Sequence, residues 1–306
     1  MYRILHKRIL NSLVEEMVIH APYVADQCQP GQFLILRVDE EGERIPLTIV
    51  DFDRQLQTVT IVYQIAGFST HLLSTLQQGD SIHDVLGPLG QPADLSALME
   101  LTIAAPSTIE PSTSNEASVS RNMPVKAVPA KKILGIGGGV GAAPLYPQLR
   151  ALSRLGASVD VILGGRNEEF ILLADEFSAF CQNVHLATDD GSAGRKGFVT
   201  DVLKDLLENE NYCAVIAIGP LMMMKAVCDM TLGAGIHTSV SLNPVMVDGT
   251  GMCGGCRVTV DGKVKFACVD GPDFDGHQVD FDECIRRQGM YREEEHICRL
   301  RYSEPN

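Results

Sequence analysis

The chain has 306 residues, a formal net charge of −14 and a hydrophobic fraction of 45%. This length suits two or three domains with sizeable cores, and the acidic balance argues against nucleic acid or an anionic membrane as a partner. No apolar run reaches the length of a membrane span, and the first ten residues lack the apolar stretch of a signal peptide. Nine cysteines, an odd number, favour a reducing compartment, so we expect a cytoplasmic protein.

Residues 1–104 are predicted to form a small β-barrel. Apolar or alternating strands are expected over 32–38, 47–51 and 57–64, with Gly and Pro between them and one helix over 70–77. Arg44 offers a fork of donors for a phosphate, and the Ser69-Thr70 pair opens the helix with free backbone amides. Ser-Thr before a helix is more often a plain N-cap, so each signal alone is weak.

Residues 105–132 differ in composition from the rest of the chain. They are rich in Ser, Thr and Pro and show no apolar periodicity, so they cannot bury enough surface to offset the entropy of ordering them. We expect a flexible linker or surface insertion without a part in the chemistry.

Residues 133–242 alternate strands with helices. Short apolar strands are expected over 133–136, 158–163, 184–187 and 214–218, with helices near 143–155, 172–180, 200–209 and 222–232. Such alternation predicts a parallel, doubly wound α/β sheet.

A glycine-rich loop follows the first strand of this block. It carries a G-x-G-x-x-P pattern at Gly139, Gly141 and Pro144, where backbone can approach a pyrophosphate at a helix N-terminus. Polar or glycine residues also follow the other strands, and such strand ends meet at one edge of the sheet: Arg166, Asp189, Asp190, Gly219 and Pro220. A tight turn without a ligand, or a solvated turn at the two aspartates, fits the same residues.

Residues 243–306 contain a cysteine-rich module and a charged tail over 280–301 that we expect to be helical. Cys253, Cys256 and Cys268 match the last three places of the plant-type [2Fe-2S] spacing, and Asp248 holds the first. A carboxylate oxygen can replace a thiolate as ligand. A hairpin over 257–267 would return the chain to deliver Cys268. Structural zinc or a redox dithiol are the alternatives.

Taken together, the motifs resemble the ferredoxin-NADP reductase superfamily. The resemblance rests on R-x-P-L-T at residues 44–48, G-x-S-T at 67–70, GPLG at 87–90, the G-x-G-x-x-P loop and a late Gly-Pro. The closing module resembles the dihydroorotate dehydrogenase electron-transfer subunits. CVDGPDFDGH and TDDGSAGRKGFVTDVL resemble one branch, the small subunits of NADH-dependent reduced ferredoxin:NADP oxidoreductases, also described as sulfide dehydrogenase subunits.

This resemblance implies a β-barrel flavin domain, an α/β doubly wound nucleotide-binding domain and a small C-terminal iron–sulfur module. It implies FAD contacts from Arg44, Pro46, Leu47, Thr48, Tyr63, Gln64, Gly67, Ser69 and Thr70. It implies nicotinamide dinucleotide contacts from Gly139, Gly141, Pro144, Arg166, Asp189, Asp190, Gly219 and Pro220. It implies a [2Fe-2S] cluster on Asp248, Cys253, Cys256 and Cys268.

The implied function is electron transfer. Hydride exchange between NAD(H) and FAD would be followed by single electrons through the cluster, with no general acid or base. NADP(H) stays possible, because Arg166 suits a 2′-phosphate and Glu168 opposes one. The family implies a large partner subunit with flavin and [4Fe-4S] clusters, with electron bifurcation and ferredoxin reached through the complex. Dihydroorotate, sulfide or hydrogenase partners are alternatives, and a redox sensor or a zinc-stabilised binding protein is the non-enzymatic one.

Overall fold

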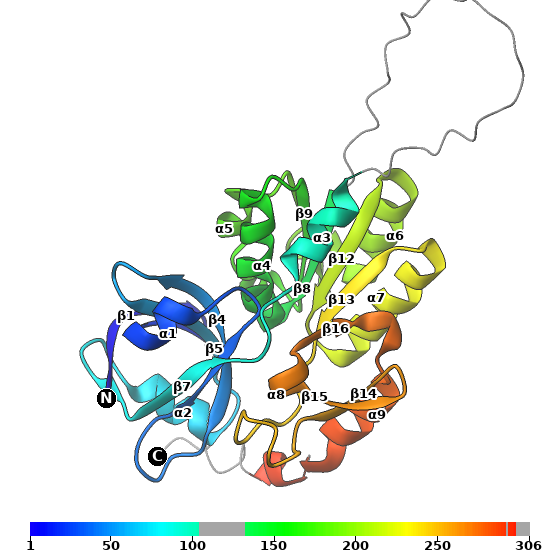
Figure 1. The fold of residues 1–306 in the computed structure, drawn as a ribbon. Coiled ribbons are helices and arrows are strands. Elements are labelled where there is room, and N and C mark those ends of the chain that lie inside the picture. The colour runs from blue at the N-terminus through cyan, green and yellow to red at the C-terminus, as the bar shows by residue number, and fades with distance from the viewer. Residues whose placement is uncertain (104–131, 292, 298–306) are drawn as a thin grey trace, which may run out of the picture.

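The computed structural model describes residues 1–103, 132–291 and 293–297. The N-terminal part is an antiparallel sheet that curls into a nearly closed barrel, with strand order β6-β1-β2-β5-β4-β3-β7 (Figure 1). Its strands are β1 (Tyr2–Asn11), β2 (Val14–His20), β3 (Phe33–Arg37), β4 (Ile45–Asp53), β5 (Thr58–Gln64), β6 (Ser81–Ile82) and β7 (Asp84–Leu89), and its helices are α1 (Pro22–Gln27) and α2 (Phe68–Thr75).

The barrel confirms the predicted β-rich block and adds four strands that the sequence did not indicate, namely β1, β2, β6 and β7. Strands β1 and β2 pair along most of their length. The sequence pattern of β1 does not indicate a strand, because most of its side chains are partly or fully exposed and only Ile4 and Asn11 are buried. The predicted helix begins two residues earlier than expected, at Phe68.

The second sheet has the order β11-β10-β9-β8-β12-β13-β16. Its strands are β8 (Lys132–Gly138), β9 (Val159–Gly165), β10 (Asn183–Thr188), β11 (Arg195–Lys196), β12 (Tyr212–Ile218), β13 (His237–Ser241) and β16 (Asp273–Asp275). The chain runs outward from β8 on one side and then crosses to β12 on the other. Ligands of such sheets bind at this reversal, beyond the carboxyl ends of the strands.

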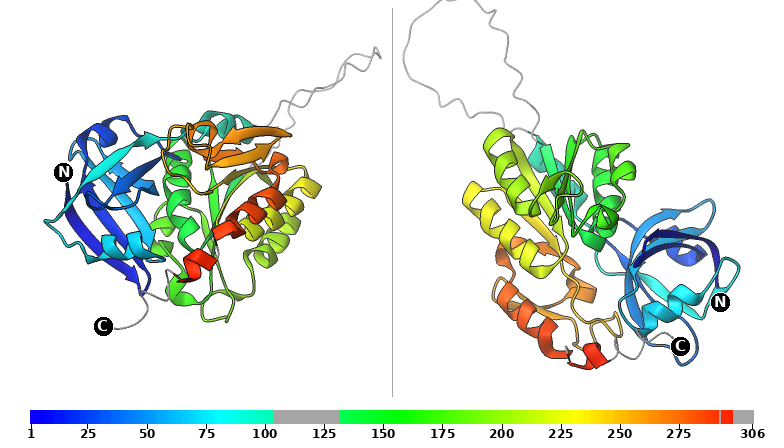
Figure 2. Two further views of the ribbon diagram at one scale, coloured as in Figure 1. Left: turned by 90° about the horizontal axis from the view of Figure 1, so that it is seen from below. Right: turned by 180° about the vertical axis from the view of Figure 1, so that it is seen from behind.

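Helices cover both faces of this sheet, which confirms the doubly wound prediction. One face packs under α3 (Leu95–Thr102), α4 (Ala142–Arg154) and α5 (Ala174–Ser178), and the other under α6 (Val199–Asn209) and α7 (Leu221–Ala234) (Figure 2). Helix α3 precedes the expected linker, yet it packs on α4 and β12. Of the expected linker, residues 105–131 lie outside the described ranges, and Lys132 begins β8.

The third block is not separate from the second sheet. Strand β16 pairs antiparallel with β13 and forms its edge, so a purely parallel sheet was wrong at that edge. The predicted hairpin is confirmed as β14 (Arg257–Val260) and β15 (Lys263–Phe266). Its turn residues Asp261 and Gly262 have φ of 52° and 65°, which is typical of a type I′ turn. The block continues with α8 (Ala267–Asp270) and α9 (Phe281–Gln288).

Four single 3₁₀ turns complete the described elements: η1 (Gly139–Gly141), η2 (Glu168–Phe170), η3 (Gly276–Gln278) and η4 (Gly289–Tyr291). Within the expected helical tail, α9, η4 and residues 293–297 are helical, while residues 298–306 lie outside the described ranges.

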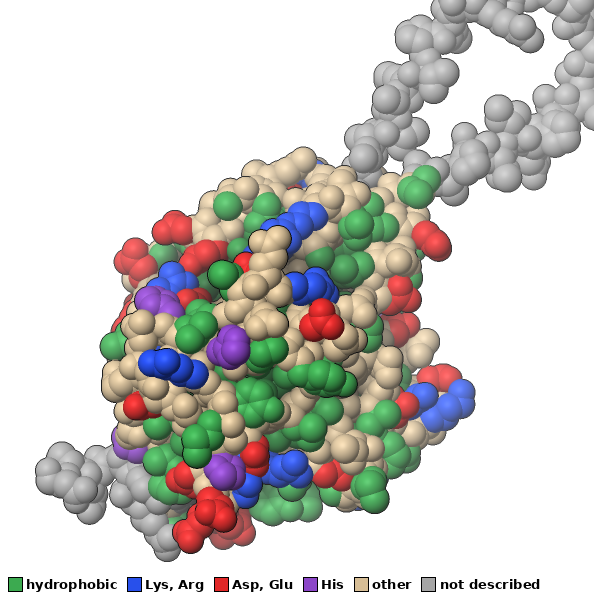
Figure 3. Space-filling view, turned by 60° about the vertical axis from the view of Figure 1, so that its left-hand side comes forward, with side chains coloured by type: hydrophobic (Ala, Val, Ile, Leu, Met, Phe, Trp, Pro, Cys, Tyr) green, Lys and Arg blue, Asp and Glu red, His purple; other side chains and the backbone are tan. Residues whose placement is uncertain are grey.

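The surface drawn in Figure 3 mixes both signs of charge with exposed hydrophobic side chains, so the net negative charge is not gathered in one patch on that face. No helix among the described residues is long and apolar enough to cross a membrane.

Candidate cofactor and electron-transfer site

A cavity of about 1090 Å³ opens where the three parts of the chain meet. Its walls come from β4 and β5 of the barrel, from the loops after β8, β9, β10 and β12, and from residues that follow β13. Most of the residues predicted to hold FAD or the nucleotide line it: Pro46, Leu47, Thr48, Tyr63, Gln64, Gly139, Gly141, Pro144, Arg166, Asp189, Gly219 and Pro220. The structure therefore brings together two predicted sets that lie far apart in the sequence.

Five predicted residues do not line this cavity: Arg44, Gly67, Ser69, Thr70 and Asp190. Arg44 lies exposed just before β4. Gly67 is the N-cap of α2, and Thr70 Oγ1 accepts a hydrogen bond from its amide at 3.1 Å. Ser69 donates to Glu43 Oε2 at 2.5 Å. Thr70 thus already acts as a helix-capping residue.

Gly67 nonetheless leaves room for a ligand at the start of α2. A Cβ built on Gly67 would meet no atom within 4 Å, so the backbone there is open to approach. The helix amides beyond it suit the negative charge of a pyrophosphate.

The glycine loop of the second domain also fits a phosphate group. Gly139 has φ of +55° and no atom within 4 Å of a Cβ position, so its backbone is exposed at the mouth of the loop. Gly141 has a different reason to be glycine, since a Cβ there would lie 2.2 Å from the Ile218 carbonyl oxygen. The loop leads through η1 into the N-terminus of α4. These two glycines let β8, β12 and a ligand come close together.

The loops after β9 and β10 form the outer part of the cavity. The Arg166 guanidinium lies 4.5 Å from the centre of the Phe170 ring, which orients it by a cation–π contact. Asp189 lines the cavity, whereas Asp190 accepts from the Ser192 amide at 2.9 Å. Hydrogen bonds from Ser192 lower the pKa of Asp190. Both aspartates are exposed, so the solvated-turn alternative describes the contacts of Asp190 and stays open for Asp189.

The four predicted cluster ligands lie in two pairs. Cys256 Sγ and Cys268 Sγ are 3.2 Å apart and buried. Cys253 is exposed, and its amide donates to Asp248 Oδ2 at 2.6 Å. Burial, with the neighbouring Cys256, raises the pKa of Cys268 to about 12, so this sulfur becomes a thiolate only beside a cation.

This arrangement suits two metal centres better than one. Among the described residues, no group of three or more His, Cys, Asp or Glu side chains surrounds a single point. A structural zinc needs four ligands around one ion. Two irons bridged by sulfides need two protein ligands each, and the paired donors fit that requirement.

Two side chains connect the cavity with the buried cysteines. Phe33 of β3 and Met246 both line the cavity, and both pack in the same apolar cluster as Cys256 and Cys268. A Cβ on Gly249, in the cysteine loop, would lie 2.7 Å from Leu89 Cδ1 of β7. The cysteine module is thus packed directly against the barrel wall beside the cavity.

Sequence reasoning missed several lining residues. Phe170, Phe198, Met223 and Asn243 line the cavity, and so do Phe33 and Met246. Met223 lies three residues after Pro220, so a slightly longer loop would have included it, whereas Phe198 lies eight residues after Asp190. Phe33 carried no signal, because a buried strand residue looks the same with or without a ligand beside it.

Two family models match the chain. Residues 136–229 match an oxidoreductase NAD-binding domain, and residues 243–280 match the iron–sulfur cluster binding domain of dihydroorotate dehydrogenase B. The second match contains Asp248 and the three cysteines.

Relatives match over nearly the whole chain. A Clostridium beijerinckii protein of the adh 3′ region is 44% identical over 100% of this chain and 96% of its own. A Thermotoga maritima homologue of the dihydroorotate dehydrogenase B (NAD⁺) electron transfer subunit is 42% identical over 93% of this chain and 89% of its own. A chain in the solved structure of an NADH-dependent reduced ferredoxin-NADP oxidoreductase is 38% identical, with a TM-score of 0.82 over 99% of this chain and 98% of that one.

A flavin-type barrel, a dinucleotide-binding sheet and a cysteine module around one cavity define a pyridine-nucleotide oxidoreductase with the ferredoxin-NADP reductase fold. The chain belongs to the family of dihydroorotate dehydrogenase B electron-transfer subunits and their homologues. It is an electron-transfer subunit of a flavin and iron–sulfur oxidoreductase, and its cofactors are FAD, an iron–sulfur cluster and NAD(H). The predicted resemblance is confirmed.

Proposed function

We propose that this chain exchanges hydride between NAD(H) and FAD in the shared cavity, and then passes single electrons through a [2Fe-2S] cluster to a larger partner subunit. The observation that carries the proposal is the cavity itself, because barrel, nucleotide loops and cysteine module all contribute to its walls. The bound cofactors supply the redox chemistry, and the protein supplies orientation and electrostatics.

The protein's own residues have three tasks in this proposal. Pro46, Leu47 and Thr48 on β4 form the wall against which the flavin ring lies, with Tyr63 and Gln64 on β5 beside them. Gly139, Gly141 and Pro144 receive the dinucleotide at the N-terminus of α4, and Arg166 and Asp189 bound its outer end. Apolar side chains form most of the lining, which would disfavour water between the two rings and favour direct hydride transfer.

Asp248, Cys253, Cys256 and Cys268 would hold the cluster, which supplies one-electron transfer when it is bound. Phe33 and Met246, which line the cavity and pack with Cys256 and Cys268, would lie between the flavin site and the cluster site. In the other pair, Cys253 is exposed and Asp248 is half-buried. Electrons would therefore leave the chain on the Asp248–Cys253 side.

A partner surface around this exit is consistent with the exposed apolar residues there. Val245, Val247 and Met252 expose 52%, 50% and 89% of their surface. Apolar side chains gathered on a surface are typical of sites where proteins associate. We propose that the partner is a large flavin and [4Fe-4S] subunit, within an electron-bifurcating complex like the solved NADH-dependent reduced ferredoxin-NADP oxidoreductase. A dihydroorotate dehydrogenase-type complex is the second candidate, because the Thermotoga maritima relative is described as such a homologue.

The test is an anaerobic titration of the purified full chain with NADH and with NADPH. Flavin absorption, iron–sulfur absorption, and assays for iron and acid-labile sulfide should show all three cofactors. NADH should bleach the flavin and then the cluster. A colourless protein contradicts the proposal, and bleaching by NADPH at lower concentration than NADH overturns the choice of NAD(H).

A further inference from the structure

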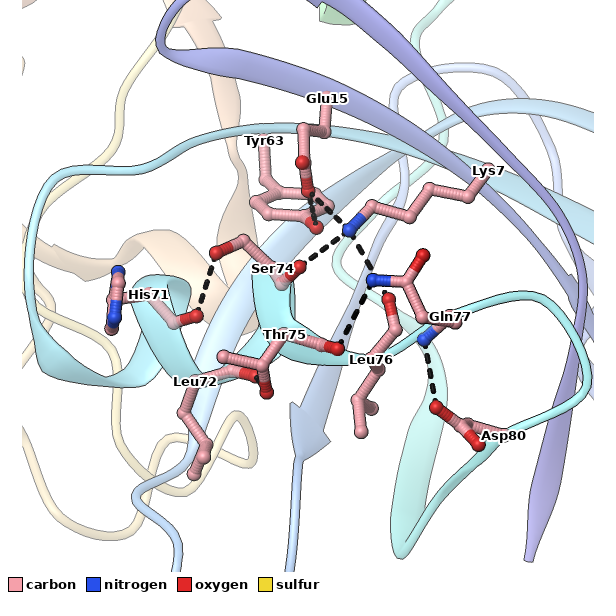
Figure 4. A network of polar contacts seen from close by, with 10 residues as sticks. All are labelled: Lys7, Glu15, Tyr63, His71, Leu72, Ser74, Thr75, Leu76, Gln77 and Asp80. Atoms are coloured by element: carbon pink, nitrogen blue, oxygen red, sulfur yellow. Dashed lines mark hydrogen bonds and ion pairs between the residues drawn. The ribbon is translucent and has the colours of Figure 1, made fainter.

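The barrel contains a buried cluster of charged and polar side chains that has no role in the proposed electron transfer. Lys7 Nζ lies 3.2 Å from Glu15 Oε2, and the Tyr63 hydroxyl donates a hydrogen bond to the same oxygen (Figure 4). The side chains of Lys7 and Glu15 are only 10% and 9% exposed. Removing two charges from water costs several kcal/mol per ion, so a buried pair calls for a structural or functional reason.

The ammonium group of Lys7 also caps a helix. It donates to the carbonyl oxygen of Ser74 and, at 3.1 Å, to that of Leu76. These carbonyls belong to the C-terminal end of α2, where the last carbonyls of a helix lack partners within the helix. A cation at this end also interacts favourably with the helix dipole. Lys7 therefore ties the end of α2 to strand β1.

The Tyr63 hydroxyl fixes the opposite end of the segment between β5 and α2 through its hydrogen bond to Glu15. Tyr63 lies on β5, lines the large cavity, and is 1% exposed. Burial, with the Glu15 carboxylate, raises the pKa of Tyr63 above its ordinary range, so the hydroxyl keeps its proton and remains a donor. Glu15 therefore fixes β5 to β2 at a point just before the chain leaves the sheet for α2.

The segment between these two anchors is the one expected to hold FAD. Residues 64–70 leave β5 and enter α2. Of the predicted FAD residues in this segment, Gln64 lines the cavity, and Gly67, Ser69 and Thr70 lie outside its lining. Tyr63 precedes the segment directly, while Ser74 and Leu76 lie one helical turn beyond it. Lys7 holds the end of α2 and Glu15 holds Tyr63, and these two side chains form an ion pair with each other. One buried ion pair therefore fixes residues 64–70 from both ends.

We propose that Lys7 and Glu15 are positioning residues for FAD, which hold residues 64–70 in the geometry that binds the cofactor without touching it themselves. This inference rests on the proposed FAD site. It assigns the buried pair to flavin binding and leaves nucleotide binding to the second domain.

The test compares Lys7→Met and Glu15→Gln with the wild type in the full-length chain. FAD affinity is measured by titrating the flavin-depleted protein, and nucleotide affinity is measured separately with NADH by calorimetry. We expect FAD binding to weaken about tenfold, because each variant removes a hydrogen bond to a charged group. NADH affinity should stay within about twofold, and Lys7→Arg should recover part of the FAD affinity.

The matched control lies on the same two strands. Arg8 and Glu16 form an ion pair at 2.9 Å, and their side chains are 42% and 15% exposed. Arg8 also pairs with Glu176 of α5 at 3.0 Å, so these ion pairs lead to the second domain and not to α2 or Tyr63. Partly exposed pairs contribute little, so Glu16→Gln should leave FAD affinity within about twofold. Equal losses of FAD and NADH affinity in all variants, control included, would indicate general destabilisation and overturn the inference.

Tyr63→Phe decides the case if the charge variants fail to fold. It keeps the ring at the cavity wall and removes only the hydroxyl that reaches Glu15. We expect FAD binding to weaken about threefold or more, while an unchanged affinity rejects the positioning role. A wild-type chain that binds no FAD at all would reject the proposed function itself, before any variant is compared.

Discussion

Gln148 Nε2 donates to Asp273 Oδ2 at 2.9 Å and joins helix α4 to strand β16. Gln148 is 1% exposed, and Oδ1 of Asp273 is buried without a hydrogen-bond partner. The barrel reaches the same point, since a Cβ on Gly31 would lie 3.2 Å from Asp273 Oδ2. One buried carboxyl thus lies where the flavin, nucleotide and iron–sulfur parts of the chain converge.

This carboxyl should make stability depend on pH. Burial raises the pKa of Asp273 from 3.8 to about 6. The folded state therefore holds the proton more tightly than the unfolded state, so the contribution is complete below about pH 4 and is lost as pH rises through 6. Asp273 should lower the free energy of unfolding by about 3 kcal/mol between these limits. Urea unfolding of the full chain from pH 4.5 to 8 measures this slope.

Asp273→Asn should remove that slope and leave the protein at pH 8 at least as stable as the wild type. The amide keeps an acceptor for Gln148 and carries no charge to desolvate. Asp261→Asn, in the exposed hairpin turn, is the control and should retain the wild-type slope. A slope that persists in Asp273→Asn would assign the pH dependence to another group.

Gly139→Ala should weaken NAD(H) binding selectively. The residue has φ of +55° and open space at its Cβ position, so a methyl group adds backbone strain and blocks the approach of a phosphate. We expect nucleotide affinity to fall about tenfold or more with FAD content unchanged, as measured by NADH titration.

Gly235→Ala is a matched control for this change. Gly235 ends α7 with φ of +66° and also has no atom within 4 Å of a Cβ, but it does not line the cavity. Both variants should lose about 1 kcal/mol of stability, and only Gly139→Ala should lose nucleotide affinity. Equal NADH affinity in the two variants would reject a phosphate contact at Gly139.

The sequence predicted the second domain better than the first, for a physical reason. Strands β8, β9 and β12 are buried on both faces, so they form apolar runs that stand out between helices. Strand β1 buries only two of its residues, and its pairing with β2 comes from backbone hydrogen bonds that leave no residue pattern. Strand β16 joins the second sheet from a distant segment, which local sequence cannot indicate.

The site residues also divide into those that a local sequence pattern predicts and those that only the fold brings together. Glycines and strand-end residues such as Gly139 and Arg166 have local signatures, and they do line the cavity. Phe33 and Met246 do not, because their importance lies in being next to both the cavity and Cys256. The sequence also did not indicate the Lys7–Glu15 pair. Charged residues that alternate with apolar ones in a strand are normally expected to face solvent, and only the position of α2 in the structure shows that Lys7 is covered.

Arg150→Met should slow flavin reduction by altering the contact between the two large domains. Arg150 of α4 forms a bidentate ion pair with Asp51 of β4 and stacks over Tyr146 at 5.0 Å. The pair is partly exposed, so we expect a stability loss of only about 1 kcal/mol. Hydride transfer needs close alignment of two rings held by different domains, so stopped-flow reduction by NADH should slow severalfold. If Arg150→Met is reduced by NADH at the wild-type rate, the apolar interface between the domains aligns the two rings without the ion pair.

Asp248→Cys tests whether the first ligand of the cluster is a carboxylate. The structure offers a second explanation for Asp248, because its Oδ1 and Oδ2 accept from the amides of Thr250 and Cys253 at 2.9 and 2.6 Å. If Asp248 binds iron, a thiolate in its place should preserve iron content and shift the midpoint potential and the spectrum of the reduced cluster.

Asp248→Asn separates the two explanations. The amide oxygen can still accept one of the backbone hydrogen bonds, but a neutral amide is a poor ligand for iron. A ligand role therefore predicts loss of iron and sulfide in Asp248→Asn and retention in Asp248→Cys. A turn-forming role predicts nearly normal cluster content in Asp248→Asn and an unshifted potential in Asp248→Cys. Iron analysis and anaerobic redox titration of both variants, beside Cys284→Ser as a buried cysteine outside the ligand spacing, distinguish the two.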